Sequence, residues 1–193
     1  MLKLNPPSTG LVLIDIQQGI LAIPMGPRQA PEIVANCSRL AKACKEAGAT
    51  VIYVKVDFAA DYADKPNRPT DVPMVLPPGG LPAGFASHHP DLLATAPDLV
   101  VTKRQWSAFF GTELDLQLRR RGIDTIVLGG LATNFGVEST ARDAWQHNYA
   151  VVIAEDACSS FSAEMHDFSI RSVMPRIAHV SETGAISAAL AAA

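Results

Sequence analysis

The sequence predicts a three-layer α/β/α domain built on a six-stranded, mostly parallel sheet. Six short apolar runs rich in β-branched residues are nearly continuous rather than alternating, which is typical of strands buried on both faces. Helical patterns separate most of these runs, and strands that alternate with helices indicate a parallel sheet. A chain of 193 residues without an obvious linker suits one domain, which we assign to residues 1–193.

Each predicted strand is a short run of mostly apolar, β-branched residues. In chain order the strands are Gly10–Ile14, Thr50–Val56, Leu99–Thr102, Thr125–Gly129, Ala150–Ala154 and Arg176–Val180. Helices are expected at Pro31–Ala47, Thr112–Arg121, Val137–His147 and Ser162–Val173. The first two helices are followed by Gly48 and Gly122, at the position where a left-handed residue ends a helix.

The segment Asp57–Asp98 departs from this alternation because it is rich in Pro, Gly and Asp. Its prolines exclude a long regular element, since proline lacks the backbone N–H that a helix or strand uses. A loop of this length in a compact domain is more often functional than idle. We therefore expect it to cover a site or to reach a neighbouring subunit.

The composition indicates which classes of binding partner to expect. The net charge is −3 and 48% of the residues are hydrophobic, which favours a globular chain and gives no sign of nucleic-acid or membrane-surface binding. No apolar run approaches the roughly 20 residues of a membrane span. The first residues lack the apolar core of a signal peptide, so we expect a cytoplasmic protein with reduced thiols at its three cysteines.

Three segments that follow predicted strands carry the candidate chemistry. Asp15 follows the first strand, Lys103 follows the third, and residues 131–136 follow the fourth. Carboxyl ends of parallel strands meet at one edge, where ligands of such sheets bind. Burial would raise the pKa of Asp15 unless a cation lies nearby, and Lys103 is the obvious candidate. Such a pair suits proton transfer, although an aspartate here could instead cap a loop or helix.

The stretch after Lys103 contains a run of aromatic residues. Trp106 is available to line a pocket, but aromatic residues at this spacing also belong to cores. Ser107 or Thr112 can cap the helix that follows. Gln17, two residues after the candidate acid, is a plausible polar contact for a ligand.

Taken together, these motifs resemble the isochorismatase-like hydrolases, often called the cysteine hydrolase family. The aspartate, a Lys-x-x-x-Ser-Ala-Phe stretch from Lys103 and a Ser-Thr-Ala-Arg-Asp-Ala stretch from Ser139 occur in the expected order. The resemblance covers nearly the whole chain. It implies a cis bond between Leu131 and Ala132, and an oxyanion hole formed by the N–H groups of Ala132 and Gly136 at the head of a helix. Phe135 in the same turn joins the candidate substrate contacts.

Gly136 decides which reaction to consider, because most members of that family carry a nucleophilic cysteine there. Glycine excludes an acyl-enzyme at this position, and Cys158 is expected to be a buried, inert thiol rather than a substitute. Isochorismatases proper also have glycine, and their aspartate is thought to protonate a vinyl ether that water then attacks. The resemblance therefore implies an Asp/Lys acid–base hydrolase of a small vinyl ether, of the isochorismate type. A carbon–nitrogen hydrolase using activated water and a non-catalytic ligand-binding relative are the alternatives.

No metal or other cofactor is expected. Nicotinamidases place an aspartate and two histidines after the second strand, whereas Asp57 here is followed by Phe-Ala-Ala-Asp-Tyr. His88 and His89 are adjacent, and neighbouring side chains diverge, so they rarely share a metal ion. Because members of the family are commonly oligomeric, we expect a homo-oligomer that acts on a small molecule.

Overall fold

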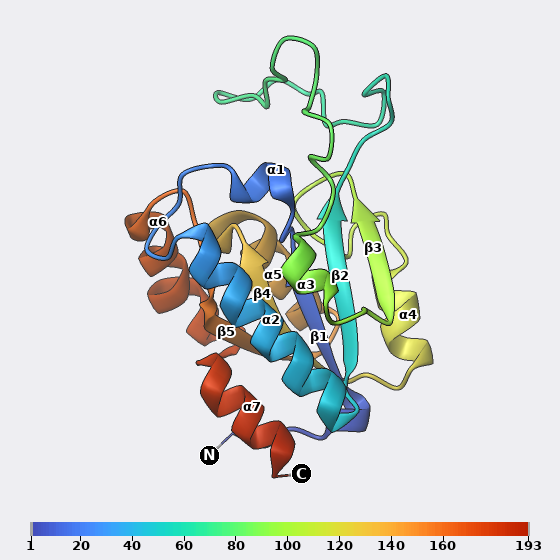
Figure 1. Ribbon diagram of the computed structural model, residues 1–193, viewed down its shortest axis with the longest axis vertical. Coiled ribbons are helices and arrows are strands. Elements are labelled where there is room, and N and C mark those ends of the chain that lie inside the picture. Colours follow the sequence, from blue (N-terminus) through green and yellow to red (C-terminus); the bar gives the residue numbers. More distant parts are fainter. Residues whose placement is uncertain (1, 193) are drawn as a thin grey trace.

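The computed structural model describes residues 2–192 and contains one six-stranded sheet covered by helices on both faces (Figure 1). The strand order is β3-β2-β1-β4-β5-β6, and every neighbouring pair is parallel. This confirms the predicted fold class. The strands are β1 Thr9–Ile14, β2 Thr50–Val56, β3 Leu99–Lys103, β4 Thr125–Leu131, β5 Ala150–Ser159 and β6 His179–Ser181.

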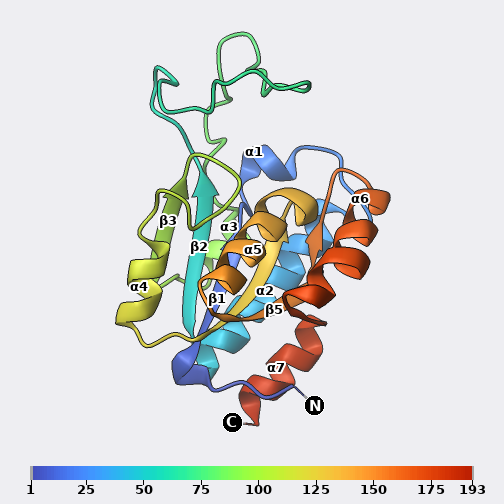
Figure 2. The same cartoon turned by 180° about the vertical axis from the view of Figure 1, so that it is seen from behind.

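The helices form the two outer layers. They are α1 Gln18–Leu21, α2 Ala30–Ala47, α3 Pro90–Leu93, α4 Leu114–Arg120, α5 Glu138–Gln146, α6 Ala163–Phe168 and α7 Thr183–Ala191. Helices α2 and α7 cover the face that is nearer in Figure 1, whereas α4 and α5 cover the face that is nearer in Figure 2. Short turns complete the chain: η1 Pro6–Ser8, η2 Thr133–Val137, η3 Ser169–Val173 and η4 Met174–Arg176. None of the helices in residues 2–192 is long and apolar enough to cross a membrane.

Strand β1 shows why the apolar runs are continuous. Leu11 and Leu13 belong to the core beneath α2 and α7, whereas Val12 and Ile14 belong to the core beneath α4 and α5. Successive side chains of a strand point to opposite faces, so a central strand with a helix layer on each side must be apolar at every position. All four side chains are essentially inaccessible to solvent.

The C-terminal third differs in detail from the predicted elements. The predicted strand Arg176–Val180 begins later, at His179, because Met174–Arg176 forms a 3₁₀ turn. The predicted helix Ser162–Val173 is α6 followed by the π-type turn η3. Helix α7 was not predicted, since its alanine-rich sequence lacks a clear apolar period. Its first turn is held by Asp156, whose carboxylate accepts from the backbone N–H of Thr183 at 2.7 Å.

The predicted long loop becomes an arm that projects beyond the carboxyl ends of β2 and β3 (Figures 1 and 2). The arm comprises residues 57–89, and the short helix α3 and a turn then lead into β3. Val72 and Val75 on the arm are 90% and 80% exposed. The arm therefore rises from the edge of the sheet at which the candidate residues lie.

Candidate active site

The candidate active site lies at the edge where the carboxyl ends of the strands meet. Asp15 directly follows β1, Lys103 is the last residue of β3, and Leu131 is the last residue of β4. Strand β1 lies between β2 and β4, so segments that are distant in the sequence reach one edge of the sheet. Ligands of open parallel sheets bind at this edge.

Asp15 and Lys103 form a buried ion pair. The Nζ atom of Lys103 donates to Asp15 Oδ2 at 2.8 Å and to the backbone carbonyl of Trp106 at 2.7 Å. Both side chains are almost completely buried. The second carboxylate oxygen, Asp15 Oδ1, is also buried but has no hydrogen-bond partner among residues 2–192. A buried oxygen without a partner is costly and needs a functional or structural explanation.

Two further properties set Asp15 apart from a structural aspartate. Burial raises its pKa above the usual range, and this effect exceeds the opposing effects of Lys103 and of the backbone N–H of Val56. Its φ angle is +54°, in the left-handed region that a non-glycine residue occupies at a cost of about 1–3 kcal/mol. Such residues cluster at active sites, where the surrounding structure holds them in place.

The turn after β4 presents backbone groups next to this pair. The Leu131–Ala132 peptide bond is cis, and η2 begins at the next residue. The carbonyl of Ala132 accepts from the N–H groups of Phe135 and Val137 at 3.0 and 3.2 Å. The N–H of Ala132 itself makes no hydrogen bond within the described chain. Unpaired N–H groups at the head of a helix are suited to an oxyanion or another electron-rich group.

Gly136 lies directly beside the ion pair. A Cβ atom at this position would lie 3.2 Å from Lys103 Nζ and 2.9 Å from Ile14 Cγ2. The first atom of a side chain here would therefore contact Lys103. The turn and the Asp15–Lys103 pair thus lie side by side. Gly130 permits the close approach of β4 to β1, because its φ is +115° and a Cβ would lie 2.1 Å from the carbonyl oxygen of Ile14.

Aromatic side chains lie beside the turn. Trp106 is 61% exposed and packs edge-on against Phe135, with ring centroids 4.9 Å apart. Phe161, just after β5, packs against the other side of Phe135 at 5.7 Å. Phe109, in contrast, is buried in the core, where its ring packs on His147. Of the aromatic residues near Lys103, Trp106 and Phe110 are exposed, and Trp106 is in contact with Phe135 of the turn. Phe161 was missed because the predicted strand Ala150–Ala154 ends well before it, whereas β5 continues to Ser159.

Gln17 has a structural task. Its Nε2 donates to the carbonyl of Val56 at 2.9 Å, and its Oε1 accepts from the N–H of the same residue at 2.7 Å. A longer contact reaches the carbonyl of Phe85 at the base of the arm. Because both amide atoms are used by the backbone, Gln17 clamps the end of β2 to the arm. We therefore leave it out of the proposed substrate contacts.

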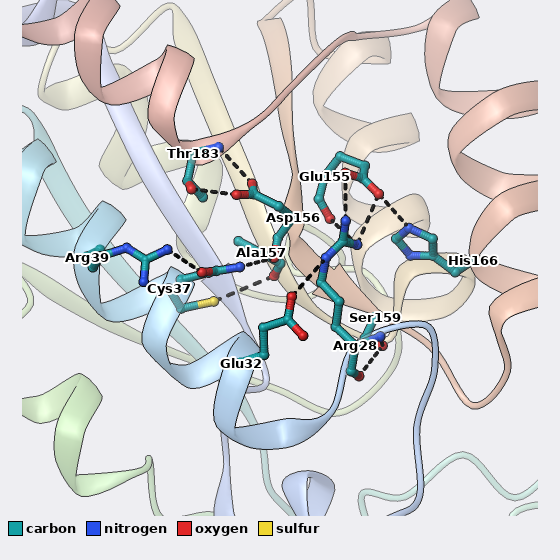
Figure 3. Close-up of polar contacts among 11 residues, drawn as sticks. Arg28, Glu32, Cys37, Arg39, Glu155, Asp156, Ala157, Ser159, His166 and Thr183 are labelled. Atoms are coloured by element: carbon teal, nitrogen blue, oxygen red, sulfur yellow. Dashed lines mark hydrogen bonds and ion pairs between the residues drawn. The ribbon is translucent and has the colours of Figure 1, made fainter.

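A second, partly buried polar cluster joins Arg28, Glu155 and His166 (Figure 3). Arg28 binds both carboxylate oxygens of Glu155 at 3.0 Å. Glu155 Oε1 lies 3.1 Å from Nε2 of His166, whose Nδ1 lies 2.8 Å from the hydroxyl of Thr133. Sequence reasoning missed this cluster because its members share no motif or spacing.

The thiols offer no alternative nucleophile. Cys37, Cys44 and Cys158 are unpaired and buried. Burial raises the pKa of Cys158 to about 12, so the thiolate that would be required as a nucleophile is disfavoured. Residues 2–192 contain no cluster of three or more His, Cys, Asp or Glu side chains that could hold a metal ion.

A carboxylic acid, a lysine and a turn with an unpaired backbone N–H at this edge are suited to acid–base hydrolysis without a side-chain nucleophile. The Isochorismatase domain model matches residues 9–185, and the chain therefore belongs to the isochorismatase family of hydrolases.

Comparisons with individual proteins support this assignment. The chain is 51% identical over 180 residues to the isochorismatase family protein YecD of Escherichia coli O157:H7, covering 93% of this chain and 95% of YecD. An isochorismatase family protein from Burkholderia thailandensis superimposes with a TM-score of 0.92 at 42% identity, over 98% of each chain. The ureidoacrylate amidohydrolase RutB of Acinetobacter baylyi is 30% identical over 207 residues, covering 94% of this chain and 83% of RutB.

Proposed function

We propose that the chain hydrolyses a small vinyl ether of the isochorismate type by acid–base catalysis, without a covalent intermediate. The observation that carries this proposal is the state of Asp15. One of its oxygens is buried without a partner, and its pKa is raised despite the adjacent lysine. A carboxyl group of raised pKa, one oxygen of which makes no hydrogen bond within residues 2–192, is suited to donating a proton.

In the proposed reaction, Asp15 delivers its proton to the terminal carbon of the enol ether, which leaves an oxocarbenium ion. Water adds to the ether carbon and returns a proton to the Asp15 carboxylate. The hemiketal then breaks its bond to the alcohol oxygen and releases pyruvate and the alcohol. Lys103, 2.8 Å from Asp15 Oδ2, stabilises the carboxylate that forms when the proton leaves.

The other groups bind and orient the substrate. The backbone N–H groups of Ala132 and Gly136 bind negative or electron-rich oxygens of the substrate. Leu131, the residue before Ala132, sets where the turn begins. Trp106 and Phe135, which are in edge contact, provide an apolar wall for an unsaturated ring. Gly136 contributes by its lack of a side chain, because a Cβ would lie 3.2 Å from Lys103 Nζ.

The second candidate is hydrolysis of a carbon–nitrogen bond by water that Asp15 activates. The similarity to a ureidoacrylate amidohydrolase favours it, since 30% identity extends over 94% of this chain. Because glycine at position 136 offers no thiol for an acyl-enzyme, this reaction would proceed by direct attack of water. A third alternative is a relative that binds a ligand without turning it over.

The test is a product assay on purified wild-type protein, Asp15→Asn and the control Glu46→Gln, which alters an exposed carboxylate near the C-terminal end of α2. Isochorismate should release pyruvate with wild type and the control, and Asp15→Asn should be slower by about 10²–10⁴-fold. Equal rates in wild type and Asp15→Asn would overturn the proposal. Ammonia released from ureidoacrylate, without pyruvate from isochorismate, would establish the second candidate. Binding without either product would establish the third.

We also propose that the enzyme is a cytoplasmic homo-oligomer, in which the arm reaches a second copy. Val72, Met74 and Val75 form a short exposed apolar run on the arm and support this, because contiguous exposed apolar surface is typical of interaction sites. Light scattering coupled to size-exclusion chromatography should give a mass of at least two chains. A single-chain mass at micromolar concentration would contradict it.

A further inference from the structure

The turn that carries Gly136 is held in place by a chain of polar groups that begins at Thr133 and ends at Arg28. Thr133 is the first residue of η2 and follows Ala132 directly. Its side chain is fully buried, and its hydroxyl lies 2.8 Å from Nδ1 of His166. His166 belongs to α6, which packs against η2, and its side chain is 1% exposed. The position of the turn is thus coupled to the ring of one histidine.

Glu155 fixes which nitrogen of that ring carries a proton. Burial raises the pKa of Glu155, but the hydrogen bonds from Arg28 and His166 outweigh this effect and leave the pKa below its usual range. An ionised carboxylate only accepts hydrogen bonds, so Nε2 of His166 must donate to it. In the neutral ring, Nδ1 is then an acceptor for the hydroxyl proton of Thr133.

Arg28 anchors the outer end of this chain. It binds both oxygens of Glu155, and Glu32 approaches it from the next turn of α2 at 3.6 Å (Figure 3). The Arg28 side chain is 20% exposed, so the chain of contacts runs from the solvent boundary inward to the turn. A partly buried ion pair gives little net stability, since desolvation offsets the attraction. Stability alone is therefore a weak reason for this arrangement.

We propose that Arg28, Glu155 and His166 form a positioning relay that sets the orientation of Thr133 and, through it, of the backbone N–H groups of the turn. This inference rests on the proposed function of the turn as an electrostatic binding site. His166 acts through Thr133 and does not itself contact the substrate. Ser160, just after β5, supports the same turn independently through a hydrogen bond to the side chain of Asn134.

Two substitutions of His166 separate its two hydrogen bonds. Asparagine places an acceptor where Nδ1 lies and retains the bond to Thr133, whereas glutamine places a donor near Nε2 and retains the bond to Glu155. With isochorismate, we expect His166→Gln to lower kcat about tenfold with KM changed less than about twofold. His166→Asn should keep most of the activity. His179→Gln, at an exposed position in β6, is the matched control.

A second readout does not depend on the substrate. Hydrogen–deuterium exchange of residues 133–137 should be about five- to tenfold faster in His166→Gln than in His166→Asn, the factor expected for one lost hydrogen bond. Exchange in β1 should be equal in both. Wild-type rates in both variants, equal losses in both, or a larger loss in His166→Asn would overturn the relay. If wild type releases no pyruvate, the proposed function fails, whereas the exchange comparison still decides on the relay.

Discussion

Two charged clusters, one buried and one partly buried, are built in opposite ways. In the cluster of Asp15 and Lys103, one carboxylate oxygen binds the lysine and the other has no partner in the described chain. In the cluster of Arg28, Glu155 and His166, both carboxylate oxygens are bonded. The pKa of Asp15 is raised by burial, while hydrogen bonds hold the pKa of Glu155 low in spite of burial.

This difference indicates that the fold assigns proton transfer and structural support to different clusters. A carboxyl group with a free oxygen and a raised pKa can give up or take a proton at little cost in lost hydrogen bonds. A carboxylate bound on both oxygens resists protonation and keeps its neighbours in place. We therefore assign proton transfer to the first cluster and positioning to the second, and the following experiments test that division.

Removing Lys103 should have the largest effect on turnover. In Lys103→Met the carboxylate that forms when Asp15 gives up its proton loses the one cation that contacts it among residues 2–192, at 2.8 Å. We expect kcat to fall about 10²–10³-fold, the usual effect of removing one electrostatic stabiliser of a transition state. Arg28→Met should lower kcat by less than about threefold, because it leaves the bond between His166 and Thr133 in place. Steady-state rates of pyruvate release compare the two, and equal losses would erase the distinction between the clusters.

The pH dependence should separate the clusters further. If protonated Asp15 is the acid, turnover falls about tenfold per pH unit above its folded pKa, which lies above 3.8. The contribution of Asp15 to the free energy of unfolding is complete below pH 3.8, and it is lost as the pH rises through the pKa of Asp15 in the folded protein. Glu155 behaves in the opposite way. Its contribution to the free energy of unfolding is complete above pH 4.5, and it is lost as the pH falls through its lowered pKa in the folded protein.

These opposite signs can be measured with two variants. Rate–pH profiles of wild type should show the decline on the alkaline side, and Asp15→Asn should remove it. Urea denaturation between pH 3 and pH 8 should show an acid-side loss of stability that Glu155→Gln reduces. An unchanged acid-side loss in Glu155→Gln would mean that other carboxylates cause it.

The sequence revealed the first cluster but not the second. Asp15 and Lys103 could be predicted because each directly follows an apolar strand, and the ends of parallel strands meet in space. The predicted strand at Ala150–Ala154 stops before Glu155, whereas β5 continues to Ser159. A register shift opposite residues 128–130 of β4 gives β5 extra residues and places Glu155 within the strand. Such an irregularity depends on pairing between strands and has no local signal.

The same reasoning explains the other differences. Gln17 had the right position for a ligand contact, but only the folded chain shows that Val56 uses both of its amide atoms. Helix α7 has an apolar, alanine-rich sequence, and its first turn is held by Asp156, far away in the sequence. Fold class and strand positions follow from patterns within one segment, whereas hydrogen bonds between distant segments decide how a polar side chain is used.

Adding one methyl group at Gly136 should test how tightly the first cluster is packed. In Gly136→Ala the Cβ would lie 2.9 Å from Ile14 Cγ2, 3.0 Å from the carbonyl oxygen of Leu131 and 3.2 Å from Lys103 Nζ. Overpacking of this kind lowers the free energy of unfolding by about 1–3 kcal/mol. Gly184→Ala, where a Cβ meets nothing within 4 Å, should be neutral or up to about 1 kcal/mol more stable. Urea unfolding compares the two, and equal stabilities would show that the turn yields easily.

Replacing Glu32, which contacts the outer end of the second cluster, should have the smallest effect on stability and turnover. Glu32 lies 3.6 Å from Arg28 one helical turn away, and its side chain is 57% exposed. Water and salt screen such a pair, so Glu32→Gln should lower the free energy of unfolding by at most about 0.5 kcal/mol. Turnover should not change, because Arg28 keeps both bonds to Glu155. A loss of activity in Glu32→Gln, measured with the same pyruvate assay, would extend the relay to the surface and weaken the view that Arg28 is its anchor.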